Sequence, residues 1–365
     1  MKKVLFVASV IGHLNAFHVP CIQHFKEKGY QVEAAAKLLD DIKVCEVQHN
    51  IDFERQPFRI KNIAAYKKLK KIIEDGKYDM VHCHTPVAAI LTRLAARRVR
   101  NKGTRVIYTA HGFHFFKGAP LKNWLVYFTA EWLCSFLTET LITINKEDFE
   151  FAKKHLHAKK IRYITGIGVD TSRFLVPTDR EAKRKELGFD DGQIVVLSIG
   201  ELSVRKNHRV IIEALAKIND KNVHYVIAGR GSKKEELEAL AKELGVQDNV
   251  HLLGFRKDVV DLCRAADVFC LPSLQEGLGM VTLEAMAGGL PCVASNVRGP
   301  IEIIEHGKNG FLCDCRSSDD FAKHIKSLID DEALRKKFVE NSMPIVEMFS
   351  VKNSLEQMKK IYSEE

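Results

Sequence analysis

Short apolar runs rich in Val, Ile and Leu recur along this chain and alternate with segments of helical periodicity. Five runs lie in the first half, at 4–9, 32–36, 80–82, 106–109 and 141–144, and five in the second half, at 194–199, 225–228, 250–253, 268–271 and 292–294. Such alternation is typical of parallel strands joined by crossover helices. Because 365 residues exceed one core of ordinary size, we expect two doubly wound, Rossmann-like α/β domains that face a central cleft.

The strand and helix pattern lapses after residue 165, in a stretch that contains Gly166, Gly168 and Pro177. We therefore expect an N-terminal domain over residues 1–172, a linker over 173–192 and a C-terminal domain over 193–345. The remaining residues, 346–365, are expected to form a helix that returns to the N-terminal domain. Ligands of doubly wound sheets bind at the carboxyl ends of the strands, so the functional residues should lie there.

The composition is that of a globular protein. No apolar run reaches the ~20 residues that a membrane span needs. The apolar start from Val4 to Ile11 has no small-residue cleavage site directly after it, so we predict a buried first strand and not a signal peptide. Nine cysteines are scattered through apolar runs without a CxxC pair, which favours reduced, buried thiols in a cytosolic protein.

Positive charge is concentrated in the first half of the chain. Residues 1–172 hold 28 Lys and Arg against 16 Asp and Glu, a net +12, whereas residues 173–365 hold 28 against 31, a net −3. The excess predicts an anionic partner, which could be a phosphate-bearing substrate, a membrane surface or a nucleic acid. No aromatic-basic interleaving supports nucleic-acid binding. A predicted helix over 61–75 has an apolar side with Ile63 and a basic side that suits a membrane, formed by Lys67, Lys68, Lys70 and Lys71.

A nine-residue segment of the second half, Glu276 to Glu284, indicates a ligand site. It follows an apolar run and leads into a helix start, so two carboxylates bracket a loop that contains Gly277 and Gly279. Glycine lets the backbone approach a ligand, and the unpaired N–H groups of a first helical turn favour a phosphate. Carboxylates placed before and after that turn suit the hydroxyl groups on either side of a pyrophosphate. The segment therefore predicts a sugar nucleotide as ligand.

The second half resembles the retaining family-4 glycosyltransferases of the GT-B fold in the order and spacing of its motifs. Besides the two glutamates these motifs are Gly200 with Arg205-Lys206-Asn207, Ala228-Gly229, Asn249 to Gly254 and Gly288 to Ser295. In the first half, Tyr108 to His114 and Gly168 to Phe174 are similar to family signatures, so the resemblance covers nearly the whole chain. Within the family the chain is most similar to bacterial enzymes that build capsular and exopolysaccharide repeat units.

The resemblance implies a role for each matching residue. Glu276 would bind hydroxyls of the donor sugar near the reacting carbon, and Glu284 would bind the ribose. Arg205 and Lys206 would neutralise the departing diphosphate, and His111 would face the donor sugar from the first domain. The backbone of Leu278, Gly279, Met280 and Val281 would cap the phosphates, and Phe255 and Arg256 would meet the nucleobase. The remaining donor-binding positions would be Gly12, Gly229 and Gly277.

One departure from the family pattern follows the first strand of the second half. Many relatives have Arg directly after the strand-ending glycine, whereas this chain has Glu201 after Gly200. One phosphate contact is then missing, so we expect Arg205 to contribute more to binding of the diphosphate.

We expect no metal ion and no cofactor other than the donor. Departure of a nucleoside diphosphate needs fixed positive charge, which the two cations of the second half can supply, and the sequence contains no Asp-x-Asp ligand pair. Histidines at two predicted strand ends could form a zinc-type site with Cys83. These histidines are His82, His84, His111 and His114. We favour structural or acceptor-cleft roles for them, because alternate residues of one strand are only a weak signal of metal ligation.

The sequence thus predicts a cytosolic, metal-independent, retaining glycosyltransferase, peripheral at the inner face of a membrane. It would move a hexose or an N-acetylhexosamine from a nucleotide donor, with UDP favoured, to a glycan or polyprenyl-linked glycan acceptor in surface polysaccharide synthesis. Two alternatives stay open. A sugar-nucleotide epimerase of the same fold would release an altered sugar without an acceptor. A two-domain solute-binding protein would not be an enzyme, and such proteins normally need export.

Overall fold

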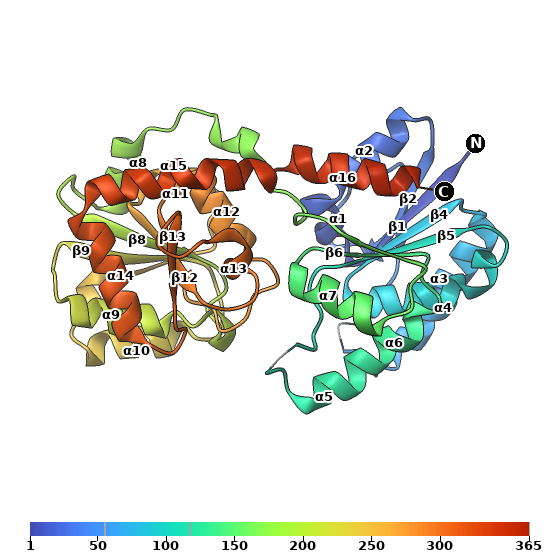
Figure 1. Cartoon of the computed structure of the whole chain (residues 1–365), viewed down its shortest axis with the longest axis horizontal. Helices are drawn as coiled ribbons and strands as arrows, with labels where there is room; N and C mark the ends of the chain where they lie inside the picture. Colours follow the sequence, from blue (N-terminus) through green and yellow to red (C-terminus); the bar gives the residue numbers. More distant parts are fainter. Residues whose placement is uncertain (55, 117, 365) are drawn as a thin grey trace. The chain divides into compact units, whose positions relative to one another are not determined.

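The chain forms two compact units in a computed structural model that describes residues 1–54, 56–116 and 118–364 (Figure 1). The first unit comprises Met1–Gly168 and Val351–Glu365, and the second comprises Val169–Ser350. Each unit is built on a parallel sheet with helices on both faces. The prediction of two doubly wound, Rossmann-like α/β domains is therefore confirmed.

The first sheet has seven strands in the order β3-β2-β1-β4-β5-β6-β7, and every neighbouring pair is parallel. The strands are β1 (Lys3–Val10), β2 (Gln31–Lys37), β3 (Val47–Asn50), β4 (Met80–His84), β5 (Arg105–Ala110), β6 (Thr140–Thr143) and β7 (Lys160–Tyr163). The apolar start of the chain forms β1, a buried central strand, as predicted. The edge strands β3 and β7 are only half-buried or exposed.

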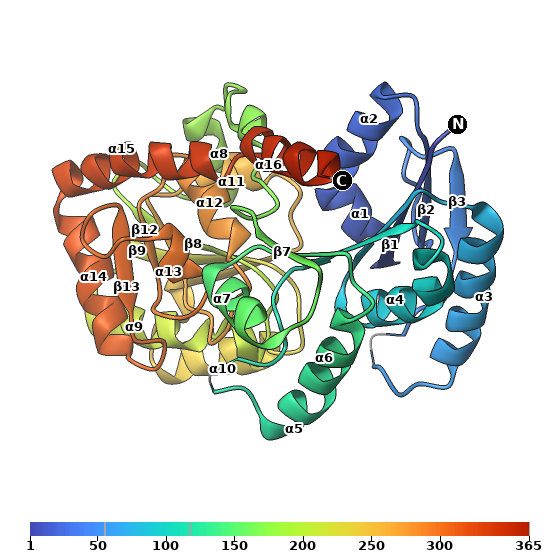
Figure 2. The same cartoon turned by 45° about the vertical axis from the view of Figure 1, so that its right-hand side comes forward.

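Helices cover both faces of the first sheet (Figure 2). One face packs against α1 (Ile11–Phe17), α2 (Val19–Glu27) and α16 (Val351–Ser363). The other carries α3 (Lys61–Gly76), α4 (Pro86–Arg100), α6 (Thr129–Ser135) and α7 (Lys146–His155), with α5 (Leu121–Asn123) and the single turn η1 (Trp124–Phe128) before α6. Apolar side chains of α3, α4 and α7 form the main core of this unit with β1, β4 and β5.

The second sheet has six parallel strands in the order β10-β9-β8-β11-β12-β13. The strands are β8 (Ile194–Ile199), β9 (Val223–Ala228), β10 (Val250–Gly254), β11 (Val268–Leu271), β12 (Cys292–Ser295) and β13 (Gly310–Cys313). The short turns are η2 (Thr171–Phe174), η3 (Val204–Lys206) and η4 (Gln247–Asn249). Strand order reverses between β8 and β11, and ligands of such sheets bind beside that switch point.

Figure 1 shows the helices of the second unit in two layers. One layer contains α8 (Arg180–Leu187), α11 (Val259–Ala265), α12 (Met280–Ala287) and α15 (Glu332–Met348), and the other contains α9 (Arg209–Ile218), α10 (Lys234–Glu243) and α14 (Ser318–Asp330). The short helix α13 (Pro300–Ile303) follows β12. All nine cysteines are free thiols, and only Cys315 is not fully buried.

The segment 173–192, for which the sequence predicts a linker, is instead an ordered part of the second unit. Asp179 caps the first turn of α8 by accepting the Ala182 N–H at 2.9 Å, and Gly188 ends the helix with a left-handed φ of 82°. The Arg184 side chain is buried and donates to the carbonyl of Ala265 at 2.9 Å. A charged composition therefore masks a helix that is held by its caps and by one buried arginine.

Candidate functional site

A buried ion pair lies where the central strands β8 and β11 of the second sheet end. Lys206, the last residue of η3, donates from Nζ to Glu276 Oε1 at 2.6 Å, and each side chain is 10% exposed. Ser273 Oγ lies 2.7 Å from the same carboxylate oxygen, and an Arg205 guanidinium nitrogen lies 3.4 Å from it. All these contacts use Oε1, so within the described residues Oε2 has no protein partner and can accept a ligand hydroxyl.

The turn that carries the two cations is held against the end of β11. Asn207 adopts a left-handed φ of 52°, a conformation that Asn tolerates better than most residues. Its Nδ2 donates to the carbonyl of Pro272 at 3.2 Å, and the Leu274 N–H donates to the carbonyl of Arg205 at 2.8 Å. These bonds fix Arg205 and Lys206 beside the carboxylate.

The strand-ending glycine of β8 makes room for the lysine stem. A Cβ on Gly200 would lie 3.1 Å from Lys206 Cε. Glu201 is exposed, and the side chain of Arg205 is 46% exposed. Arg205 is thus the cation that faces solvent at this strand end. In the family pattern a further arginine would stand at position 201.

Helix α12 begins directly after the Gly-containing loop. Gly279 precedes the helix with a φ of 84°, and no side chain caps the first turn. Its free N–H groups and the positive end of the helix dipole attract an anion to Met280 and Val281. Leu278 is buried, and a Cβ on Gly299 would lie 3.0 Å from its backbone. The loop is therefore packed closely from one side while the helix start is uncapped.

The second glutamate of the motif lies one turn further along α12. Glu284 is 24% exposed, and its Oε1 lies 3.6 Å from a guanidinium nitrogen of Arg173. Burial raises the pKa of Glu284, and Arg173 opposes this shift. A carboxylate in this position can exchange the weak arginine contact for the hydroxyl groups of a ligand.

A pocket of about 440 Å³ lies beside the carboxyl ends of β9 and β10. A Cβ on Gly229 would lie 1.7 Å from the carbonyl oxygen of Gly200, so only glycine fits where the two loops cross. Phe255 is 60% exposed, with the Arg230 guanidinium 6.0 Å from its ring, and can offer a face to a planar base. The lining residues are Leu202, Gly229, Arg230, Gly231, Lys234, Leu252, Leu253 and Gly254.

Arg256, expected to meet the nucleobase, is engaged elsewhere. Its guanidinium donates to Asp258 and to Glu186, at 2.8 Å in each case. These hydrogen bonds raise the pKa of Arg256 and lower that of Asp258. The charged end of Arg256 is therefore bound by two carboxylates, whereas Phe255 is open.

In the first unit the predicted site residues lie at the carboxyl ends of central strands. His111 follows β5, and its Nε2 lies 3.1 Å from His13 Nε2 and 3.4 Å from His84 Nδ1. Burial keeps the pKa of His111 well below its usual range, and His13 and His82 act in the same direction. His111 is therefore a neutral hydrogen-bonding group at pH 7. Gly12 precedes His13 in α1, and a Cβ there would meet no atom within 4 Å.

The histidines considered as metal ligands gather only in part. Cys83 Sγ donates to the carbonyl of Ile107 at 3.4 Å within the core, and the His114 ring packs 4.7 Å from that of Tyr127. His82 and His84 instead approach His111 together with His13 and His18, which the sequence had not linked to them.

Sequence reasoning also missed two residues of the second unit that contact the two glutamates. Ser273 lies two residues after the buried strand β11, a position that marks functional residues in doubly wound sheets. Arg173 lies within the segment Gly168 to Phe174, which was noted for its family likeness without a role.

These are the features of an α/β protein with two Rossmann-like units and a polar site at the strand ends of the second. The family description "Glycosyl transferases group 1" matches residues 179–343, and "Glycosyl transferase 4-like" matches residues 3–145. EpsD of Bacillus subtilis (strain 168), named as a glycosyltransferase without a stated substrate, is 41% identical over 367 residues, which are 99% of this chain and 96% of EpsD. The chain therefore belongs to the family-4 glycosyltransferases of the GT-B fold, as the resemblance implied.

Further relatives agree with this assignment. The UDP-Gal:alpha-D-GlcNAc-diphosphoundecaprenol alpha-1,3-galactosyltransferase of Escherichia coli is 30% identical over 310 residues, 83% of this chain and 80% of that enzyme. Among solved structures, HepE of Anabaena in complex with UDP shares the fold with a TM-score of 0.81 at 24% identity, with both chains fully covered. In the described part of the chain, no helix is both long and apolar enough to cross a membrane.

Proposed function

We propose that the protein transfers a hexose or an N-acetylhexosamine from a UDP-sugar to a glycan or polyprenyl-linked glycan during synthesis of a surface polysaccharide. The single observation that carries this proposal is the buried Lys206–Glu276 pair beside the uncapped start of α12. The pair offers a carboxylate oxygen for sugar hydroxyls, and only the short loop 277–279 separates it from the helix start, where phosphates would bind. The 30% identical galactosyltransferase, whose name states a UDP-sugar donor and a diphosphoundecaprenol acceptor, supports this choice of substrates.

The proposed reaction needs no metal ion. Negative charge develops on the departing diphosphate, and Arg205 together with the first-turn N–H groups of α12 would stabilise it. Lys206 would hold Glu276 in place and add positive potential. We propose retention, in which the acceptor oxygen forms its bond to the anomeric carbon on the face that the phosphate oxygen leaves. The acceptor proton then passes to the departing phosphate, so no further base is required.

We further propose that the protein acts in the cytosol at the inner, anionic face of a membrane. Near the start of α3, Phe58 and Ile60 are each 83% exposed and Ile63 is 58% exposed. Ile63, expected on the apolar side of the helix, is thus exposed, whereas Leu69 and Ile73 of the same helix are buried. The exposed lysines of the same helix are Lys67, Lys68 and Lys71. Apolar and basic side chains therefore share one surface, which suits binding to the headgroup layer of a membrane.

The neighbouring segment from Arg93 to Arg105 contributes less to such a surface than its charge suggests. Arg93 is buried against Glu131, with a nitrogen to oxygen distance of 2.8 Å. Arg105 donates to the carbonyl of Tyr362 at 2.7 Å. Arg97 and Arg98 of α4 remain exposed.

Calorimetry with UDP and with the whole donor tests the roles of the two glutamates. We expect Glu284→Gln to weaken UDP binding. Glu276→Gln should leave UDP affinity nearly unchanged and lower turnover by on the order of 10²-fold, as losses of single transition-state contacts do. Glu340→Gln, at an exposed position of α15, is the matched control. Equal loss of UDP affinity in both site variants, or turnover that stops when EDTA is added, would contradict the proposal.

A further inference from the structure

Four histidines converge at one end of the first sheet. They come from separate elements, because His13 lies in α1, His18 joins α1 to α2, His84 ends β4 and His111 follows β5. One ring nitrogen of each lies within 4.8 Å of those of the other three. Imidazole nitrogens are ligands of zinc and of similar divalent transition-metal ions.

The spacing of the nearest nitrogens fits tetrahedral coordination. Zinc–nitrogen bonds of 2.0–2.1 Å place two ligand nitrogens roughly 3.3–3.4 Å apart. The two measured contacts of His111 Nε2 are 3.1 Å to His13 Nε2 and 3.4 Å to His84 Nδ1. His111 therefore already has nearly the separation from two of its partners that such an ion imposes.

Buried ring nitrogens of the cluster lack partners among the described residues. In the described structure His18 Nε2 is buried without a hydrogen-bond partner, which is unfavourable unless a ligand or water binds nearby. His84 Nε2 and His111 Nδ1 also lack a partner there, but they are the ring nitrogens opposite those that face the common centre.

A fifth histidine fixes the base of the cluster without being available as a ligand. His82 Nε2 lies 2.8 Å from Thr109 Oγ1, and His82 Nδ1 lies 2.9 Å from the hydroxyl of Tyr362 in α16. Both ring nitrogens are thus engaged. Its ring packs against that of His84, with centroids 4.1 Å apart, and supports the orientation of that side chain.

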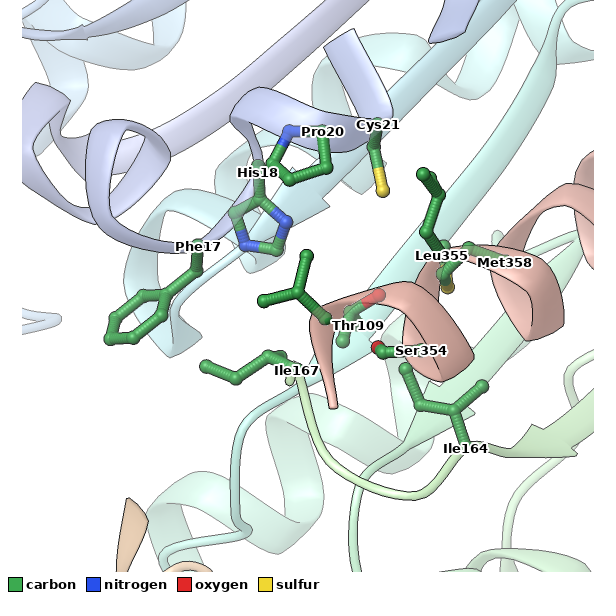
Figure 3. Close-up of a pocket in the computed structure, with 11 residues that line it drawn as sticks. Phe17, His18, Pro20, Cys21, Thr109, Ile164, Ile167, Ser354, Leu355 and Met358 are labelled. Atoms are coloured by element: carbon green, nitrogen blue, oxygen red, sulfur yellow. The ribbon is translucent and has the colours of Figure 1, made fainter. Parts of the chain in front are cut away.

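His18 is the ligand that must move. Its ring stacks on that of His84, with centroids 3.7 Å apart and planes 24° apart, so the in-plane lone pairs of the two rings run nearly side by side and do not converge on one ion. Figure 3 shows His18 among the residues that line a cavity, together with Leu355 and Met358 of α16. The volume of this cavity is about 20 Å³. Because this space is about that of one water molecule, the ring has room to turn about its side-chain bonds.

We propose that the first unit binds one Zn²⁺-class divalent ion through His13, His18, His84 and His111. The ion is not a requirement of sugar transfer. Because it would engage His111, which is expected to contact the donor sugar, a bound ion would inhibit transfer. This inhibition rests on the proposed function, whereas the binding itself does not.

Cobalt binding to the full chain tests the site without any donor. The protein, free of a polyhistidine tag, is stripped with EDTA, desalted and titrated with Co²⁺ while its visible absorption is recorded. We expect one equivalent with the strong absorption of four-coordinate cobalt, displaced by one equivalent of Zn²⁺. His13→Gln and His18→Gln should each weaken binding by at least about 100-fold, because each removes a ligand.

Two controls distinguish this site from other histidines. His114→Gln removes a neighbouring histidine outside the cluster and should leave cobalt binding unchanged. His324→Gln removes one member of the Cys313, Asp320 and His324 group in the second unit, which also could hold an ion, and should leave it unchanged too. Tryptophan emission and circular dichroism establish that each variant is folded.

Several results would overturn the proposal: only weak six-coordinate absorption, full binding by both site variants, or loss of binding in His324→Gln. Inhibition of donor hydrolysis by Zn²⁺ is measured separately. If cobalt binds as expected but Zn²⁺ does not inhibit, the metal site stands and the expected contact of His111 with the donor sugar is wrong.

Discussion

The buried ion pair between Arg93 and Glu131 should dominate the stability of the first unit. Arg93 of α4 and Glu131 of α6 are 1% and 4% exposed and lie 2.8 Å apart. The Arg93 guanidinium also lies 4.2 Å from the ring of Tyr108, whose hydroxyl donates to Glu131 at 3.2 Å. Tyr108 belongs to β5, the strand that leads to His111. The pair therefore holds α4 and α6 on β5, the strand that directly precedes the predicted site residue His111.

Removing one partner leaves the other charge buried and unpaired, which costs about 3–5 kcal/mol. For a unit of roughly 180 residues, each kcal/mol corresponds to about 2–4 °C, so Arg93→Met should lower its midpoint by roughly 6–20 °C. Glu131→Gln should cost a similar amount. The double variant should be more stable than the sum of the two losses predicts, because neither charge is then stranded.

The assay can isolate the first unit because both tryptophans of the chain, Trp124 and Trp132, belong to it. Unfolding followed by tryptophan emission thus reports on this unit alone. Arg98→Met is the matched control, since Arg98 is 66% exposed and its carboxylate partner is 4.0 Å away. Such a pair contributes at most about 1 kcal/mol. An Arg93→Met midpoint as high as that of Arg98→Met would refute the reasoning.

Three further predictions concern pH, backbone packing and lipid binding. Burial lowers the pKa of His13 to about 4 from 6.5, so between these pH values the unfolded chain binds a proton that the folded unit does not. The stability of the first unit, measured by tryptophan emission, should therefore fall as the pH is lowered from 6.5 to 4, and it should fall less steeply in His13→Asn. Equal slopes in the two proteins would contradict this. Gly229→Ala should lower UDP affinity and the second unit's stability by about 1–3 kcal/mol, because its Cβ would clash, whereas Gly192→Ala, which meets no atom within 4 Å, should do neither. The protein should cosediment with vesicles of anionic lipid but not of neutral lipid, and salt should release it. Reversal of the exposed lysines Lys67, Lys68 and Lys71 to Glu should abolish this binding. If sedimentation is unchanged in that variant, these lysines form an ordinary solvated surface.

The central strands were predictable from the sequence, whereas of the four edge strands only β10 was predicted. Central strands of parallel sheets are buried on both faces and therefore read as continuous apolar runs. The edge strands β3 and β7 were missed because solvent reaches them and their sequences mix polar and apolar residues. The edge strand β13 was missed although it is apolar, because its four residues, Gly310–Cys313, form too short a run. The capped helix α8 was read as linker for a related reason, since its sequence is mostly charged.

The candidate donor site could be located because its residues form short contiguous motifs at strand ends. Glu276, Arg205 and Lys206 lie together in the structure although about 70 residues separate them, because their strands β8 and β11 are neighbours. The histidine cluster could not be found in this way. His13 and His18 are isolated in helical sequence, and only the pairing of β1 with β4 brings that end of the chain beside His84.

Completion of the first unit requires residues that are synthesised after the whole of the second. Residues 351–363 form α16, and its Tyr362 bonds to His82 across 280 positions of sequence. During translation the first 168 residues emerge without this helix, so His82 and the apolar surface under α16 are uncovered while the second unit is being made. A chain cut after the first 168 residues would therefore not be an independent first unit but an unfinished one.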